Sequence, residues 1–170
     1  SGYSHAIQID ADGQHNLNDC DKFINAIAAD PHALIAAYPK YDDSVPRHRL
    51  IARYLTHVWV WINTLSLDIV DSMCGFRAYP LQATVALLDA GLRADRMDFD
   101  SEILVRWHWA GNHLVQFPTQ VIYPENSHSN FLPFTDNKLI SMMHTRLFFG
   151  MLVRLPILIK RKFEGLLSGR

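Results

Sequence analysis

The chain has 170 residues, of which 49% are hydrophobic, and this is enough for one folded domain with a buried core. Its formal net charge is -1, so no overall basic field predicts a nucleic-acid partner, and any anion site must be local. The nine histidines are scattered and the two cysteines form no CxxC pair, which excludes the usual zinc-site patterns and fits a reducing compartment. Because residues 1–5 are polar and the apolar run after them is short, we expect no signal peptide and a cytoplasmic protein.

The first predicted element is a strand over 6–9, which ends in the string DADGQH at 10–15. Apolar and polar residues alternate along this strand, and Gly13 permits the sharp turn that ends it. Asp10 and Asp12 would then lie at the carboxyl end of a strand in an α/β sheet, where ligands collect. Carboxylate oxygens are preferred ligands of Mg²⁺ and Mn²⁺, so the string indicates a metal site that neutralises a phosphate group. The alternative is a plain turn that begins at Asp10.

The next segments predict a helix, a strand and a second helix. Apolar residues at helical spacing over 23–28 indicate a surface helix that ends at Asp30 and Pro31, and the apolar run 33–37 is assigned to a strand. A polar loop follows over 39–46, and an apolar stripe then predicts a helix over 47–66. Arg53, in the first turns of that helix, is either an ordinary solvated charge or a contact to an anionic acceptor.

The string DSMCGFRAYP at 71–80 holds several candidate binding residues. Gly75 can let the backbone approach a ligand closely, and Arg77 offers a rigid fork for a phosphate group. The structural alternatives are a capping role for Asp71 and a core position for Phe76. A helix is predicted over 81–92 and is stopped near Gly91.

The string MDFDSEIL at 97–104 predicts the start of another helix. Asp100 and Glu102 would lie near its amino terminus, which is electrostatically favourable in itself. In the functional interpretation one of them, with Asp100 preferred, is a general base. It would take the proton from the hydroxyl group of a substrate that accepts a transferred group. An acceptor that is already a phosphate would need no such base.

Two extended segments, 113–118 and 119–123, precede a polar loop in which His128 is either a metal or diphosphate contact or a solvated histidine. The apolar run 142–159 is interrupted by Arg146, Arg154 and Pro156, so we expect that it does not cross a bilayer. The basic, amphipathic segment from Lys160 onward indicates an end that lies on an anionic membrane surface.

The strings at 10–15, 71–80 and 97–104 occur in an order that resembles family 2 glycosyltransferases, especially the dolichyl-phosphate-mannose synthase-like branch. The resemblance covers about residues 6–123. It implies an α/β, Rossmann-like GT-A fold, of which 1–134 form the carboxyl-terminal portion and 135–170 form a membrane-associating helical tail. It implies an enzyme that moves a sugar from a nucleotide-sugar donor to a lipid or lipid-linked acceptor at the cytoplasmic membrane face, with Mg²⁺ or Mn²⁺.

The resemblance also suggests residue roles. The metal positions are Asp10, Asp12 and Gln14, and the donor diphosphate would contact Asp10, Asp12 and Arg77. The residues expected at the acceptor are Arg53, Asp71, Gly75, Phe76, Arg77 and His128. Relatives carry an Arg-x-x-Gly-x-Ser-Lys loop that this chain replaces at 123–131, which argues against a polyprenyl-phosphate acceptor.

The family's nucleotide-binding half has no counterpart before the first predicted strand, so we expect a piece of a larger enzyme that is inactive alone. Two other classes stay open. Haloacid dehalogenase-like phosphohydrolases also begin with an apolar strand and Asp-x-Asp-Gly, although they continue with Thr or Val where this chain has Gln14. The other alternative is a non-catalytic membrane-surface module.

Overall fold

The computed structural model describes residues 2–41, 47–121 and 132–167, and it is a mixed α/β structure. A short 3-10 turn, Leu17–Asp19, leads into the first helix. The strands and helices, in chain order, are β1 His5–Gln8, α1 Cys20–Ala29, β2 Leu34–Lys40, α2 Arg47–Thr64, β3 Arg77–Pro80, α3 Leu81–Asp89, α4 Phe99–Ala110, β4 Leu114–Gln120 and α5 Pro133–Leu167.

The four strands form one mixed sheet in the order β1-β3-β2-β4. Strand β3 is antiparallel to both β1 and β2, whereas β2 and β4 are parallel over their whole lengths. Strands β1, β2 and β4 therefore run in one direction, and their carboxyl ends share an edge with the amino end of β3. This edge is where the strings at 10–15 and 71–80 meet the sheet.

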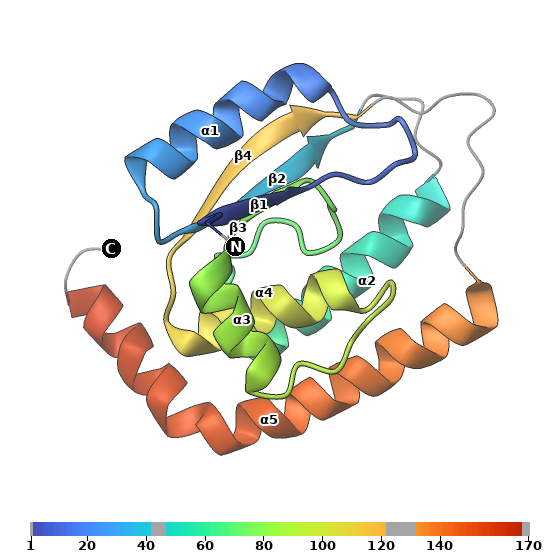
Figure 1. Cartoon of the computed structure of the whole chain (residues 1–170). Helices are drawn as coiled ribbons and strands as arrows, with labels where there is room; N and C mark the ends of the chain where they lie inside the picture. Colours follow the sequence, from blue (N-terminus) through green and yellow to red (C-terminus); the bar gives the residue numbers. More distant parts are fainter. Residues whose placement is uncertain (1, 42–46, 122–131, 168–170) are drawn as a thin grey trace.

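Helices cover both faces of the sheet (Figure 1). Helix α1 lies over one face, α2, α3 and α4 lie over the other, and α5 runs along the outer side of those three. The central strand β2 is buried on both faces, with Leu34 and Ala36 in the cluster shared with α4 and α5, and Ile35 and Ala37 in the cluster shared with α1. A strand covered on both faces is apolar without alternation, which explains the run at 33–37.

Helix α5 is 35 residues long and packs against α2 and α4. One stripe of the helix is buried in the core, and its members are Met143, Leu147, Met151 and Leu158. By length and composition the helix could cross a membrane, and 28% of its most apolar window is buried within the protein. Pro156 lies inside it, and the helix bends in Figure 1 toward its carboxyl end, as an internal proline favours.

The predicted helices over 23–30, 47–66 and 81–92 and the strand over 33–37 are confirmed, with ends shifted by a few residues. The predicted loop over 39–46 is wrong at its start, because Pro39 and Lys40 still pair with Thr119 and Gln120 of β4. The two extended segments after 113 are one strand that continues through Pro118. A proline is tolerated there because β4 lies at the edge of the sheet that the described residues form.

His144 of α5 should make stability depend on pH. Its Nδ1 lies 3.3 Å from the side-chain nitrogen of Asn63, its ring stacks on Trp59, and burial lowers its pKa to about 4. The unfolded chain binds this proton near pH 6.5 and the folded chain does not, so stability should fall as the pH drops from 6.5 to about 4. The loss should reach about 3 kcal/mol and then level off.

Urea unfolding across this pH range measures the effect. A His144→Gln protein should lack this part of the pH dependence, whereas the matched variant of an exposed histidine, His32→Gln, should keep it. Equal pH profiles for the natural protein and His144→Gln would contradict the assignment.

Candidate active site at the sheet edge

Asp10 leaves the end of β1 and lies between His15 and Gly75. His15 Nε2 is 3.8 Å from Asp10 Oδ2, and a Cβ added to Gly75 would overlap the Asp10 carboxyl group. The neighbouring His15, with the nearby charge of Arg77, holds the pKa of Asp10 below its usual value. The carboxylate is therefore ionised at neutral pH, and 43% of the side chain is exposed and can reach a ligand.

His15 is a neighbour of this carboxylate that the sequence interpretation did not single out. Its side chain is almost fully buried, 5.3 Å from the ring of Phe76, and its backbone bridges to Val121 after β4. Its Nδ1 has no hydrogen-bond partner among the described residues. Its place as the last residue of DADGQH was the signal that could have found it.

The turn after Asp10 has the predicted form. Gly13 has a φ of 73°, a conformation that glycine adopts readily, and Asp12 Oδ1 accepts a hydrogen bond of 3.0 Å from the backbone nitrogen of Gln14. Asp12 is exposed beside Asp10 in the sequence, and Gln14 is half-buried.

Asp10 and Asp12 carry the oxygen ligands that a hard divalent cation prefers. The structure holds no group of three or more His, Cys, Asp or Glu that could bind a metal within 2–41, 47–121 and 132–167. Mg²⁺ and Mn²⁺ can be held by one or two carboxylates together with waters and substrate phosphates, so an ionised, half-exposed Asp10 next to Asp12 is a suitable donor set. Waters and substrate oxygens would have to fill the remaining coordination positions of such a cation.

Asp100, in the first turn of α4, lies near Asp10 although the two are far apart in sequence. Its Oδ1 accepts a bond of 3.3 Å from the Gln8 side chain and lies 3.4 Å from Arg77 Nη1. Burial and, less strongly, the charge of Asp10 raise the pKa of Asp100 above its usual value, although Arg77 opposes this. The string at 97–104 therefore delivers a carboxyl group with increased basicity to the edge where β1 ends.

Arg77 is placed differently from the expectation. Its side chain is fully buried, and its guanidinium donates to the backbone carbonyls of Cys74, Ser72 and Asp100 at 2.8, 2.9 and 2.7 Å. It joins the 72–75 loop to the start of α4 and cannot offer its fork to a donor or acceptor phosphate. Phe76 is also turned inward, since the centre of its ring lies 4.3 Å from that of Phe23 in the core, as the structural alternative had it.

Glu102 does not lie with Asp100. Its buried carboxylate pairs with Arg106 at 2.7 Å and with Arg146 of α5 at 2.6 Å, and it accepts from the backbone nitrogen of Ala94. Of these three partners, Arg146 is the one that belongs to α5. The expectation that Glu102 takes part in catalysis is corrected to a role in holding α5 against α4.

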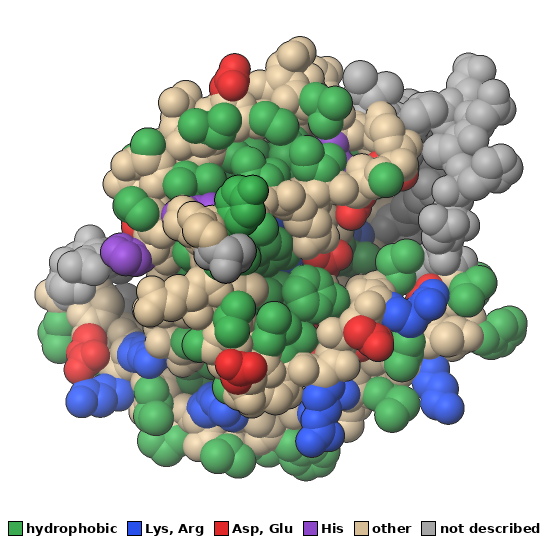
Figure 2. Space-filling view, in the orientation of Figure 1, with side chains coloured by type: hydrophobic (Ala, Val, Ile, Leu, Met, Phe, Trp, Pro, Cys, Tyr) green, Lys and Arg blue, Asp and Glu red, His purple; other side chains and the backbone are tan. Residues whose placement is uncertain are grey.

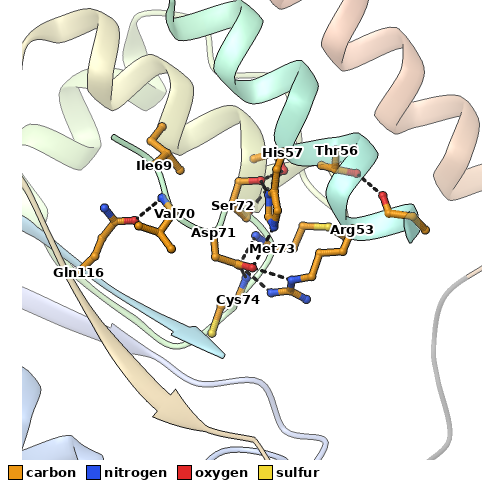
Figure 3. Close-up of polar contacts among 12 residues, drawn as sticks. Arg53, Thr56, His57, Ile69, Val70, Asp71, Ser72, Met73, Cys74 and Gln116 are labelled. Carbon is orange, nitrogen blue, oxygen red and sulfur yellow. Dashed lines mark hydrogen bonds and ion pairs between the residues drawn. The ribbon is translucent and has the colours of Figure 1, made fainter. Parts of the chain in front are cut away.

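Asp71 is the centre of a buried cluster beside the 72–75 loop (Figure 3). Arg53 binds it with two hydrogen bonds of 2.6 Å, and His57 Nε2 lies 3.1 Å away. The backbone nitrogens of Met73 and Cys74 also donate to Asp71. Burial opposes ionisation, but His57 and Arg53 together hold the pKa of Asp71 well below its usual value. Arg53 is thus committed to Asp71 and fixes the loop that carries Gly75.

A hollow of about 230 Å³ opens beside this cluster, at the carboxyl end of β2. Its lining is mainly aromatic and aliphatic and comprises Tyr38, Pro39, Tyr41, Leu50, Arg53, Tyr54, His57, Val70 and Asp71. Because β1 and β2 run in the same direction, this hollow and Asp10 lie on the same edge of the sheet. His128, the last candidate from the sequence, lies outside the described residues.

The comparisons with known proteins add a distant relative. No family model matches the chain. It is 24% identical over 126 residues to an uncharacterized protein of Methanocaldococcus jannaschii, and the match covers 72% of this chain and 51% of that protein. The chain therefore spans about half the length of the curated relative that it matches. The description of that relative names no activity.

Proposed function

We propose that this chain belongs to a GT-A fold glycosyltransferase of family 2, which transfers a sugar from a nucleotide sugar to a membrane-associated acceptor. The observation that supports this most is the meeting of three distant strings at one sheet edge. Gly75 lies against Asp10, and both Gln8 and Arg77 contact Asp100. A site built from an ionised carboxylate and a more basic one is what such a transfer needs.

Each carboxylate has a separate task in this proposal. Asp10 and Asp12 hold Mg²⁺ or Mn²⁺, which when bound offsets the negative charge of the departing nucleoside diphosphate. Asp100 takes the proton of the acceptor hydroxyl, a role that its raised pKa favours. Gln8 and Arg77 position Asp100, since both contact its carboxylate and neither is free to reach a substrate phosphate.

The acceptor would enter through the hollow lined by Tyr54 and Leu50. The Arg53 charge on its wall is neutralised by Asp71, so the lining favours an uncharged or apolar group over a phosphate. This agrees with a hydroxyl acceptor, which is the kind that requires Asp100.

A location at the cytoplasmic membrane face is part of the proposal, and α5 supports it. Large apolar residues on its outer side are exposed, among them Phe149, Val153 and Phe163. Lys160 is exposed next to them. Arg161, however, donates to the backbone carbonyls of Trp109 and His108 at the end of α4, so it contributes less to lipid attraction than its sequence position suggested.

The test is an assay of the full natural protein with a panel of nucleotide sugars, in which the release of nucleoside diphosphate is measured. Turnover should require Mg²⁺ or Mn²⁺ and stop with a chelator. Hydrolysis of a simple phosphate ester, with a phosphoryl group found on Asp10, would instead favour the phosphohydrolase. Vesicle binding without any turnover would favour the non-catalytic module.

Asp100→Asn should lower transfer to a hydroxyl acceptor by about a hundredfold or more, because the proton then has no acceptor. In the natural protein the rate should fall as the pH drops through the raised pKa of Asp100, since the protonated carboxyl cannot act as a base. The measurement is the pH profile of kcat/KM for both proteins. The acidic limb should vanish in Asp100→Asn and persist in Glu102→Gln.

A further inference from the structure

A second hollow, of about 350 Å³, lies between the end of α3, α4 and α5. Its lining comprises Arg93, Arg106, Arg146 and Arg154 together with Ala90, Gly91, Trp109, Leu147 and Gly150. None of these residues lines the hollow beside Asp71 or contacts Asp10 or Asp100, so the proposed transferase site gives it no task. Four arginines from three segments converge here. Because like charges repel each other, this arrangement costs free energy.

The positive charge in this hollow is only partly neutralised within the protein. Arg106 and Arg146 share one carboxylate, that of Glu102. Arg93 and Arg154 have no ion-pair partner in the part of the chain that the structure describes. The four arginines and the one carboxylate of Glu102 leave an excess of positive charge, which an anion of two charges would reduce.

Three of the four guanidinium groups, those of Arg106, Arg146 and Arg154, are already held by contacts within the protein. Arg106 donates to the carbonyl of Gly91 at 3.0 Å, and Arg154 donates to that of Gly150 at 2.9 Å. The Arg154 guanidinium also lies over the ring of Trp109, 4.5 Å from its centre. Arg146 has a buried Nε with no partner among the described residues, so it keeps one donor unused.

Gly150 lines this hollow at a position where a side chain would not fit. A Cβ added there would lie 2.8 Å from the ring of Trp109, and Arg154 Nη1 would be its next neighbour at 3.6 Å. The absent side chain lets Trp109 approach α5 and hold the Arg154 guanidinium in place. Little side-chain entropy then has to be lost when an anion binds.

We propose that this arginine pocket binds the phosphate group of a phosphorylated compound. Planar guanidinium forks match phosphate oxygens with paired hydrogen bonds, and the volume exceeds that of phosphate alone, so a small headgroup also fits. Exposed Leu152 and Val153 directly precede Arg154 on α5. Figure 2 shows Lys and Arg side chains gathered in the lower half of the molecule, over α5, among apolar ones. The phosphate group can therefore come from a membrane lipid or from a soluble ester.

The experiment compares two double variants that remove the same charge. Arg93→Gln with Arg154→Gln removes two of the four arginines but leaves the Glu102 pairs intact, and Lys22→Gln with Lys40→Gln is the matched control at two exposed lysines outside α5. The soluble probes are inorganic phosphate and glycerol 3-phosphate, titrated calorimetrically against chloride at equal ionic strength. The lipid probes are phosphatidylcholine vesicles with and without phosphatidic acid.

The pocket variant should lose at least about tenfold in affinity per arginine removed, whereas the control should change little. Selective loss of soluble-phosphate binding identifies a soluble ester, and selective loss of binding to phosphatidic acid vesicles alone identifies a lipid. Equal losses in both variants, or no binding of any probe by the natural protein, would overturn the proposal.

Because Arg154 also packs on Trp109, its replacement could disturb the fold. The single variant Arg93→Gln removes an exposed side chain that pairs with no described residue, so its unfolding midpoint should match that of the natural protein. Its affinity for the successful probe should still fall by about tenfold. Unchanged affinity in Arg93→Gln with an intact fold would contradict the pocket's role. These outcomes are independent of whether the sheet edge transfers a sugar.

Discussion

Sugar transfer by the full natural protein is expected to fall by at least about a hundredfold when Asp10 is replaced by Asn, because the amide keeps the shape but loses the charge that holds the divalent cation. The unfolding midpoint should change little, since the side chain is half-exposed. The measurement is metal-dependent release of nucleoside diphosphate in Asp10→Asn and in the natural protein. Normal turnover in Asp10→Asn would remove the basis for the metal assignment.

Gly75→Ala tests the same carboxylate without removing it. The new methyl group would overlap the Asp10 carboxyl group, so either Asp10 or the 72–75 loop must move, and turnover should fall to a similar extent. Gly165→Ala is the matched control, because a Cβ there would meet nothing within 4 Å. Full activity in Gly75→Ala would mean that the contact between these two residues does not matter for the reaction.

The second large effect concerns stability and arises at Asp71. Replacing Asp71 by Asn leaves the buried Arg53 charge without its partner and removes an acceptor from His57, so the free energy of unfolding should fall by about 3–5 kcal/mol. Glu164→Gln, which breaks the exposed pair with Lys160, should cost less than about 1 kcal/mol. Chemical denaturation of both variants at neutral pH gives the comparison.

The stability of the protein in acid should also depend on Asp71. The folded-state pKa of Asp71 lies below its unfolded value near 3.8, so its contribution is complete above that pH and is lost as the pH falls further. The natural protein should therefore lose stability below about pH 4 more steeply than Asp71→Asn. Parallel acid-unfolding curves for the two proteins would contradict a buried, ionised Asp71.

The fold could be predicted where the signal is local. Strand β2 was found from its uninterrupted apolar run, and α2 from its apolar stripe, because both patterns depend only on neighbouring residues. Asp10 and Asp100 were given roles in one reaction only through the family resemblance, which rests on the order of the strings. The antiparallel pairing of β1 with β3 could not be predicted, since the partner strand begins about 70 residues later.

Residue roles were less predictable, because a sequence motif does not show which way a charged side chain points or which partner it contacts. Arg77 has the residue type of a phosphate ligand, yet the backbone of α4, 23 positions away, completes its set of acceptors. Glu102 has the residue type of a general base, yet Arg146 neutralises it from 44 positions away. In both cases the deciding partner comes from tertiary packing, which spacing within a motif does not encode.

Strand β1 has a sheet neighbour on one side only among the described residues, and this position has a consequence for assembly. Ile7 is 39% exposed, and the strand contains no lysine, proline or acidic residue that would discourage a further strand from joining it. A strand added parallel to β1 would end next to Asp10. Whatever polypeptide extends the sheet at β1 would therefore also supply a wall of the proposed metal site, so completion of the sheet and completion of that site would be a single event.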